Sequence, residues 1–117
     1  MKTILIIDDE KRIRKIYVKV LAREGFSVLE AAGAEAAYEI LLSTTVDVIL
    51  LDINMPEVDG GILYKIIDSF IHKTKVIVAS AYSLENQKMA IKGATDYYDK
   101  SDSISTLLEK VHACVTE

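Results

Sequence analysis

Three acidic residues directly follow two runs of aliphatic residues, and their side chains are the ones in this chain best suited to chemistry. The run Thr3–Ile7 ends in Asp8 and Asp9, and the run Val48–Leu51 ends in Asp52. Short apolar runs rich in β-branched residues are typical of strands buried on both faces of a parallel sheet. Such sheets bind their ligands at the carboxyl ends of the strands. We therefore expect the three carboxylates to meet at that edge.

The chemistry expected of three converging carboxylates is metal binding followed by phosphoryl transfer. Carboxylates that share one cleft repel each other, and a divalent cation relieves that repulsion. Oxygen ligands of this kind favour Mg²⁺, which takes one or two carboxylates and also meets phosphate oxygens. A carboxylate placed there can attack phosphorus and form an aspartyl phosphate. Asp8, Asp9 and Asp52 thus predict a magnesium site beside a nucleophile.

Two further residues could neutralise the charge of a phosphoryl group in transfer. Ser80 places a hydroxyl at the end of the run Lys75–Ser80, and Lys100 places an ammonium just after Asp96–Asp99. Alone, Ser80 would more often be an ordinary strand-end hydroxyl and Lys100 a surface lysine. Both residues stand at the ends of predicted strands, in register with the acids. This placement makes them candidates for contacting the phosphoryl group.

The elements that must position these residues alternate regularly along the chain. Amphipathic periodicity predicts helices between the strands, and glycines or serines mark several helix ends. The predicted strands are 3–7, 27–31, 46–52, 75–80 and 96–99, and the predicted helices are 11–24, 34–43, 62–70, 84–92 and 104–115. This alternation indicates an α/β fold with a doubly wound, five-stranded parallel sheet. The expected strand order is 2-1-3-4-5, in which the first and third strands are neighbours.

Length and composition place limits on the function. A chain of 117 residues, half of them apolar, predicts one domain over residues 1–117. No stretch is long enough for a signal peptide or a membrane span, and the single Cys114 fits a reducing compartment, so we expect a cytoplasmic protein. The net charge of −4 argues against direct nucleic-acid binding.

These motifs together resemble the receiver domain of two-component response regulators over essentially the whole chain. The matching segments are Ile6–Asp9, Leu50–Pro56, Asp59–Gly60, Ala79–Ala81 and Gly93–Lys100. The likeness is greatest to stand-alone members, such as the chemotaxis and sporulation regulators. The resemblance implies a flavodoxin-like receiver fold.

For the site, the resemblance implies that Asp52 is the phosphoacceptor. Asp9, Asp52 and the main-chain carbonyl of Asn54 would bind Mg²⁺ directly, with Asp8 acting mainly through water. Ser80 and Lys100 would contact the phosphoryl group.

For signalling, the resemblance implies that Tyr97 is a switch aromatic that turns inward when Ser80 moves toward the phosphate. The phosphoryl donor would be a histidine kinase or a histidine phosphotransfer protein. A downstream effector would read a surface formed by the fourth helix, fifth strand and last helix. A phosphorylation-linked dimer is a further alternative that stays open at this stage.

The chain departs from the family pattern after Lys100, where Ser101 replaces the usual proline. A cis bond without proline costs about 2.5–4 kcal/mol, so we expect a trans bond. We also hypothesise that Asp99 and Asp102 compete for the ammonium of Lys100. A bulky Tyr82 could shield the acyl phosphate and slow its hydrolysis.

Several alternatives stay open at this stage. The basic face of the first helix is expected to be solvated, and one of Tyr97 and Tyr98 is expected to face outward. A phosphorylation-independent interaction module would keep the fold without the switch. A magnesium-dependent phosphohydrolase fits poorly, because Asn54 stands where such enzymes carry a second aspartate. We therefore expect a signalling switch whose only catalysis is its own phosphorylation and slow dephosphorylation.

Overall fold

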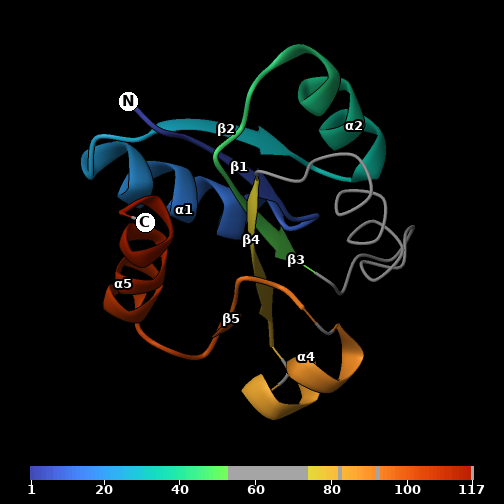
Figure 1. The fold of residues 1–117 in the computed structure, drawn as a ribbon, viewed down its shortest axis with the longest axis vertical. Helices are drawn as coiled ribbons and strands as arrows, with labels where there is room; N and C mark the ends of the chain where they lie inside the picture. Colours follow the sequence, from blue (N-terminus) through green and yellow to red (C-terminus); the bar gives the residue numbers. More distant parts are fainter. Residues whose placement is uncertain (53–73, 82, 92, 117) are drawn as a thin grey trace.

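The computed structural model describes residues 1–52, 74–81, 83–91 and 93–116. Figure 1 shows strands and helices in alternation along this part of the chain. The helix expected over 62–70 lies outside the described residues, as do Asn54 and Tyr82. The described elements are β1 (Thr3–Ile7), α1 (Lys11–Arg23), β2 (Ser27–Ala31), α2 (Ala34–Ser43), β3 (Val48–Asp52), β4 (Lys75–Ser80), α4 (Leu84–Ala90), β5 (Asp96–Asp99) and α5 (Ile104–Val115).

The five strands form one parallel sheet in the order β2-β1-β3-β4-β5, which confirms the predicted order. The register pairs Ile7 with Leu51 and Asp52 with Ala79. It also pairs Ser80 with Asp99. The carboxyl ends of β1, β3, β4 and β5 therefore lie along one edge, where the candidate residues follow.

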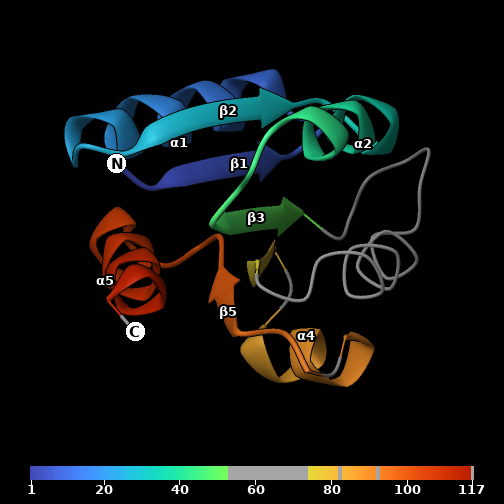
Figure 2. The same cartoon turned by 45° about the horizontal axis from the view of Figure 1, so that its top comes forward.

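Both faces of the sheet are covered, which explains the uninterrupted aliphatic runs in the central strands. Alternate residues of β1 point to opposite faces: Leu5 and Ile7 belong to one core cluster, and Ile4 and Ile6 to the other. Residues of α2 and α4 pack in the first cluster, and residues of α1 and α5 pack in the second. Figure 2 shows the helices lying around the sheet in this way. Every residue of β3 is buried.

Helix ends follow the local signals in the sequence. The Oγ atoms of Ser83 and Ser103 accept hydrogen bonds from main-chain N–H groups at the starts of α4 and α5. Gly25 and Gly93 have positive φ angles of 92° and 89°, which glycine adopts without steric cost. Helix α4 ends at Ala90, earlier than predicted, because the main chain of Ile91 is extended.

The expectation that one tyrosine of β5 faces outward is wrong. Tyr97 and Tyr98 are both buried, in opposite core clusters. Although β5 is an edge strand, α4 covers one of its faces and α5 covers the other. The hydroxyl of Tyr97 donates a hydrogen bond to the carbonyl of Ile91, at 2.6 Å.

Two residues of the last helix differ in burial. Cys114 is buried in the core cluster that also contains residues of α1. The side chain of His112 is 45% exposed, and its Nε2 is 2.8 Å from Glu24 Oε1. Among the helices that the structure describes, none is long and apolar enough to cross a membrane.

Candidate metal and phosphoryl-acceptor site

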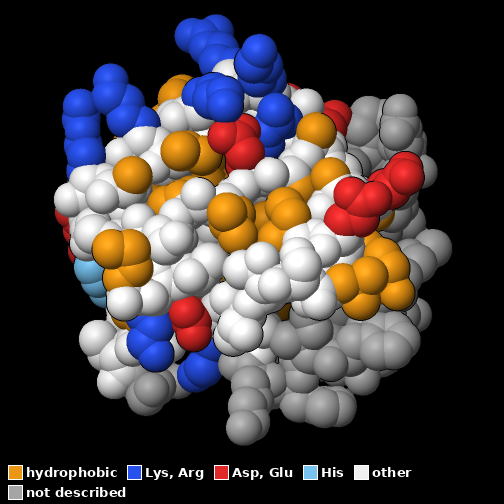
Figure 3. All heavy atoms as spheres, turned by 90° about the horizontal axis from the view of Figure 1, so that it is seen from above, with side chains coloured by type: hydrophobic (Ala, Val, Ile, Leu, Met, Phe, Trp, Pro, Cys, Tyr) orange, Lys and Arg blue, Asp and Glu red, His pale blue; other side chains and the backbone are white. Residues whose placement is uncertain are grey.

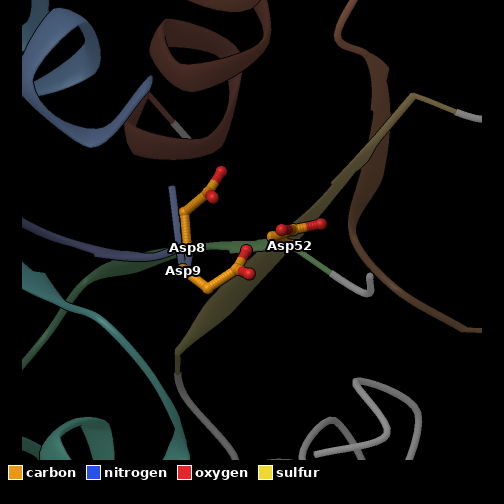
Figure 4. A group of neighbouring side chains, drawn as sticks. All are labelled: Asp8, Asp9 and Asp52. Carbon is orange, nitrogen blue, oxygen red and sulfur yellow. The ribbon is translucent and has the colours of Figure 1, made fainter. Parts of the chain in front are cut away.

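Asp8, Asp9 and Asp52 lie together beyond the ends of β1 and β3, as the strand order predicts. One carboxylate oxygen from each residue lies within 4.8 Å of the other two. Asp8 and Asp52 are 2% and 3% exposed, and Asp9 is exposed. Figure 4 shows the three side chains grouped at the ends of their strands. Two buried carboxylates and an accessible one thus lie close together.

Hydrogen bonds hold Asp8 on several sides. Its main-chain N–H donates to the carbonyl of Ala31 on β2, at 3.1 Å. Its Oδ1 accepts the N–H of Glu10 at 2.9 Å, and its Oδ2 accepts a hydrogen bond from Lys100 Nζ at 2.8 Å. The β1–α1 turn therefore presents Asp8 in a defined orientation.

Lys100 supplies the positive charge of the site. Its Nζ lies 2.8 Å from Asp8 Oδ2 and 3.4 Å from Asp52 Oδ2, and its side chain is only 14% exposed. Burial by itself would lower the pKa of Lys100, but the hydrogen bond to Asp8 and the charges of Asp52 and Asp8 outweigh burial and raise it. The ammonium therefore stays charged between the two carboxylates.

The hypothesis that Asp99 and Asp102 compete for Lys100 is not supported. Within the described residues, the ammonium forms ion pairs with Asp8 and Asp52. The carboxylate of Asp99 instead accepts hydrogen bonds from both the N–H and the hydroxyl of Ser101. The described part of the chain has no cis peptide bond, so the Lys100–Ser101 bond is trans, as predicted.

Ser80 is the last residue of β4 and is fully buried. Its carbonyl accepts the N–H of Lys100 at 2.8 Å, so the ends of β4 and β5 are tied together beside the acids. The buried side chain of Gln87 reaches the same region from α4, because its Nε2 donates to the carbonyl of Tyr98 at 2.9 Å. Hydrogen bonds thus link Ser80 with Lys100, and α4 with β5, next to the acids.

Arg14 is a residue that sequence reasoning misjudged. The basic face of α1 was expected to be solvated, but the Arg14 side chain is only 12% exposed and bonds to Glu30 and to the carbonyl of Asp8. Gln87 was not singled out at all. A single buried polar residue in an otherwise weakly amphipathic helix carries no periodic signal that would mark it.

The donor set fits a divalent cation. Three carboxylate oxygens in close proximity are hard ligands of the kind that Mg²⁺ prefers. The single positive charge of Lys100 offsets only part of the repulsion among the three carboxylates. Electrostatics therefore still favours binding of a divalent cation. The expected contribution of the Asn54 carbonyl lies outside the described residues.

A family model, curated relatives and solved structures all identify the same family. The family model described as the response regulator receiver domain matches residues 4–112. The transcriptional regulatory protein SrrA of Staphylococcus aureus is 36% identical over 114 residues, which are 94% of this chain and 46% of SrrA. This chain therefore spans less than half the length of the curated relatives that it matches.

Solved structures agree with this family. The response regulator TrrA of Thermotoga maritima, crystallised in complex with Mg²⁺–BeF, matches with a TM-score of 0.90 and 32% identity, over 98% of this chain and 100% of TrrA. A second crystal structure contains TrrA in complex with the histidine kinase ThkA (TM-score 0.89, 33% identity, covering 98% of this chain and 99% of that chain). A CheY-like receiver domain protein from Methanospirillum hungatei matches with a TM-score of 0.87 and 31% identity, over 97% and 92% of the two chains.

The chain belongs to the response regulator receiver domain family, and so it is a receiver domain of two-component signalling. A receiver domain is a signalling module rather than a conventional enzyme.

Proposed function

We propose that residues 1–117 form one receiver domain that is switched by phosphorylation of Asp52. The observation that carries this proposal is the position of Asp52: its buried carboxylate lies beside Asp8, Asp9 and the ammonium of Lys100. A carboxylate in this setting has a neighbouring cation and a candidate metal site. Both can neutralise the charge of a phosphoryl group in transfer.

Mg²⁺ is the proposed cofactor. Asp8, Asp9 and Asp52 would hold the ion, together with the main-chain carbonyl of Asn54 that the family resemblance implies. When bound, the ion would neutralise negative charge on the phosphoryl oxygens. The Mg²⁺–BeF complex of TrrA supports this proposal by similarity.

Phosphoryl transfer needs only one nucleophile from this chain. An oxygen of the ionised Asp52 carboxylate attacks phosphorus, the bond between phosphorus and the donor breaks, and the electron pair of that bond leaves with the donor. The product is an acyl phosphate on Asp52. The Lys100 ammonium, 3.4 Å from Asp52 Oδ2, is placed to pair with a phosphoryl oxygen, and the Ser80 hydroxyl would donate to another.

The switch would run from Ser80 to the surface formed by α4, β5 and α5. Phosphorylation adds a charge of roughly −1.5 to −2, which draws Ser80 and Lys100 toward Asp52. Tyr97 already lies inward in this structure, with its hydroxyl on Ile91. Its proposed role is therefore to stabilise one position of α4 rather than to enter an empty space.

The proposed partners are a histidine kinase or histidine phosphotransfer protein as donor, and an effector protein that binds the α4–β5–α5 surface. The complex of ThkA with TrrA supports the first partner by similarity. Phosphorylation-linked dimerisation through the same surface is a further outcome to test, because dimers would bury α4 and α5. Slow autodephosphorylation would end the signal.

The test is incubation with Mg²⁺ and acetyl phosphate, followed by intact-mass measurement. We expect a gain of one phosphoryl group that is absent in Asp52→Asn. The control Asp102→Asn changes an exposed aspartate that is not one of the three clustered acids, and this variant should be phosphorylated normally. An unmodified wild-type protein would instead identify a phosphorylation-independent interaction module, and turnover of many donors per chain would identify an enzyme.

A further inference from the structure

The guanidinium of Arg14 contacts the main chain between Asp8 and Asp9. Its Nη1 donates to the carbonyl of Asp8 at 2.9 Å, and its Nε donates to Glu30 Oε1 at 3.0 Å. Arg14 lies in α1 and Glu30 lies in β2, so the contact joins two elements to the end of β1. Charged hydrogen bonds of this kind are stronger than neutral ones.

Glu30 orients the guanidinium. Its second carboxylate oxygen, Oε2, accepts a hydrogen bond from Lys15 Nζ at 2.9 Å. The pKa of Glu30 is lowered by the hydrogen bonds from Lys15 and Arg14, in that order. Figure 3 shows Lys and Arg side chains gathered on the side where α1 lies, with acidic side chains among them. Glu30 therefore has two cationic neighbours, of which only Arg14 reaches the acidic turn.

The contact with the Asp8 carbonyl bears directly on Asp9. The carbonyl of Asp8 and the N–H of Asp9 belong to one planar peptide unit. Fixing the direction of that carbonyl therefore fixes the position of the Asp9 Cα, from which the side chain extends. Within the described part of the chain, the carboxylate of Asp9 makes no hydrogen bond or ion pair that would orient it otherwise.

We propose that Arg14 is a positioning residue that orients Asp9 for metal binding by holding the Asp8–Asp9 peptide, with Glu30 as its anchor. This inference rests on the proposed function, because it concerns affinity for Mg²⁺. Arginine suits the role because its planar group presents two N–H donors in fixed directions. Lysine has a single nitrogen and contacts both partners less well.

The experiment is a calorimetric Mg²⁺ titration of the unphosphorylated protein. Outer residues that orient metal ligands change metal affinity by about 10–100-fold when they are replaced. We expect Arg14→Gln to weaken Mg²⁺ binding by about tenfold, at the lower end of that range. Arg14→Lys should restore part of the affinity, and Glu30→Gln should weaken binding less than Arg14→Gln.

Lys15→Gln is the matched control. Lys15 also bonds to Glu30, but its side chain is 57% exposed and, unlike Arg14, donates no hydrogen bond to Asp8 within the described part of the chain. Lys15→Gln removes one cationic neighbour of Glu30 and should leave the Mg²⁺ affinity unchanged. Hydrogen exchange at the Asp9 amide gives a second readout, and we expect faster exchange in Arg14→Gln than in Lys15→Gln.

The outcomes separate this inference from the proposed function. If the wild-type protein binds Mg²⁺ and Arg14→Gln binds it equally well, the positioning role is refuted while the receiver function stands. Equal weakening in Arg14→Gln and Lys15→Gln would also refute it, because a general loss of positive charge would then explain the effect. If wild-type protein binds no Mg²⁺, the proposed metal site fails first. Should Arg14→Gln not fold, the Glu30→Gln titration decides: unchanged affinity overturns the inference.

Discussion

Replacing Lys100 with methionine would test whether the ammonium holds the acidic site together. Methionine keeps a long apolar side chain and removes both the charge and the hydrogen-bond donors. The Lys100 ammonium is 2.8 Å from Asp8 and 3.4 Å from Asp52, and all three side chains are largely buried. The variant therefore leaves two neighbouring buried carboxylates without their shared cation.

The expected loss follows from these distances. With an effective dielectric constant of 20, the two attractions amount to about 6 and about 5 kcal/mol. The cost of removing all three charges from water cancels much of this gain. Removing one partner of a buried ion pair costs about 3–5 kcal/mol, and the 14% exposure of Lys100 places the expectation near the lower value. We expect the free energy of unfolding in EDTA to fall by about 3 kcal/mol.

The assay is urea unfolding followed by far-ultraviolet circular dichroism, in EDTA and again in Mg²⁺. Added Mg²⁺ should recover part of the loss, because the ion no longer competes with an ammonium for the same oxygens. Each tenfold gain in affinity adds about 1.4 kcal/mol of stability at saturating ion. Wild-type protein should gain less from Mg²⁺ than Lys100→Met gains.

Lys15→Met is the control for this prediction. The ion pair of Lys15 with Glu30 is at the surface, and such pairs contribute about 0–1 kcal/mol. If Lys100→Met loses no more stability in EDTA than Lys15→Met, the ammonium does not hold the acids and the reasoning is refuted. An equal gain from Mg²⁺ in wild-type protein and Lys100→Met would refute the competition between the ammonium and the ion.

Two further predictions concern β5 and alkaline pH. Burial, then the charges of Tyr98 and the site acids, raises the pKa of Tyr17, and that of Lys100 is also raised. The folded chain thus holds these protons more tightly, so stability should be full below pH about 10 and fall above it. If the urea midpoint of Tyr17→Phe falls at alkaline pH by as much as that of the wild-type protein, Tyr17 does not contribute to the loss of stability. Separately, Tyr97→Phe loses the hydrogen bond to Ile91 and should lower the free energy of unfolding by about 1 kcal/mol in the same assay; no change would mean that this bond does not hold α4.

Much of the fold could be predicted because its signals are local. The aliphatic run before Asp52 predicted a strand buried on both faces, and every residue of β3 is buried. Ser103 predicted the start of α5, which its side chain caps. Handedness and connection length then limited the strand order. That order was sufficient to bring Asp8, Asp9 and Asp52 together, because the ends of neighbouring parallel strands share one edge.

Partner choice among polar side chains could not be predicted in the same way. The sequence offered Lys100 the nearby Asp99 and Asp102, yet its ammonium binds Asp8, which is 92 positions away. Asp99 is already engaged by Ser101.

The burial of polar and aromatic residues was likewise decided by tertiary structure. Arg14 looked like one more residue of a solvated basic face, and one of the two tyrosines of β5 was expected to face outward. Packing of β2 beside α1 buried Arg14, and packing of α4 and α5 over β5 buried both tyrosines. Hydrophobic periodicity determines which faces of an element turn inward, because it acts over a few residues. Tertiary structure decides which charged side chains meet and which edge strand is covered. Both depend on distances between elements, and these distances are set only when the chain has folded.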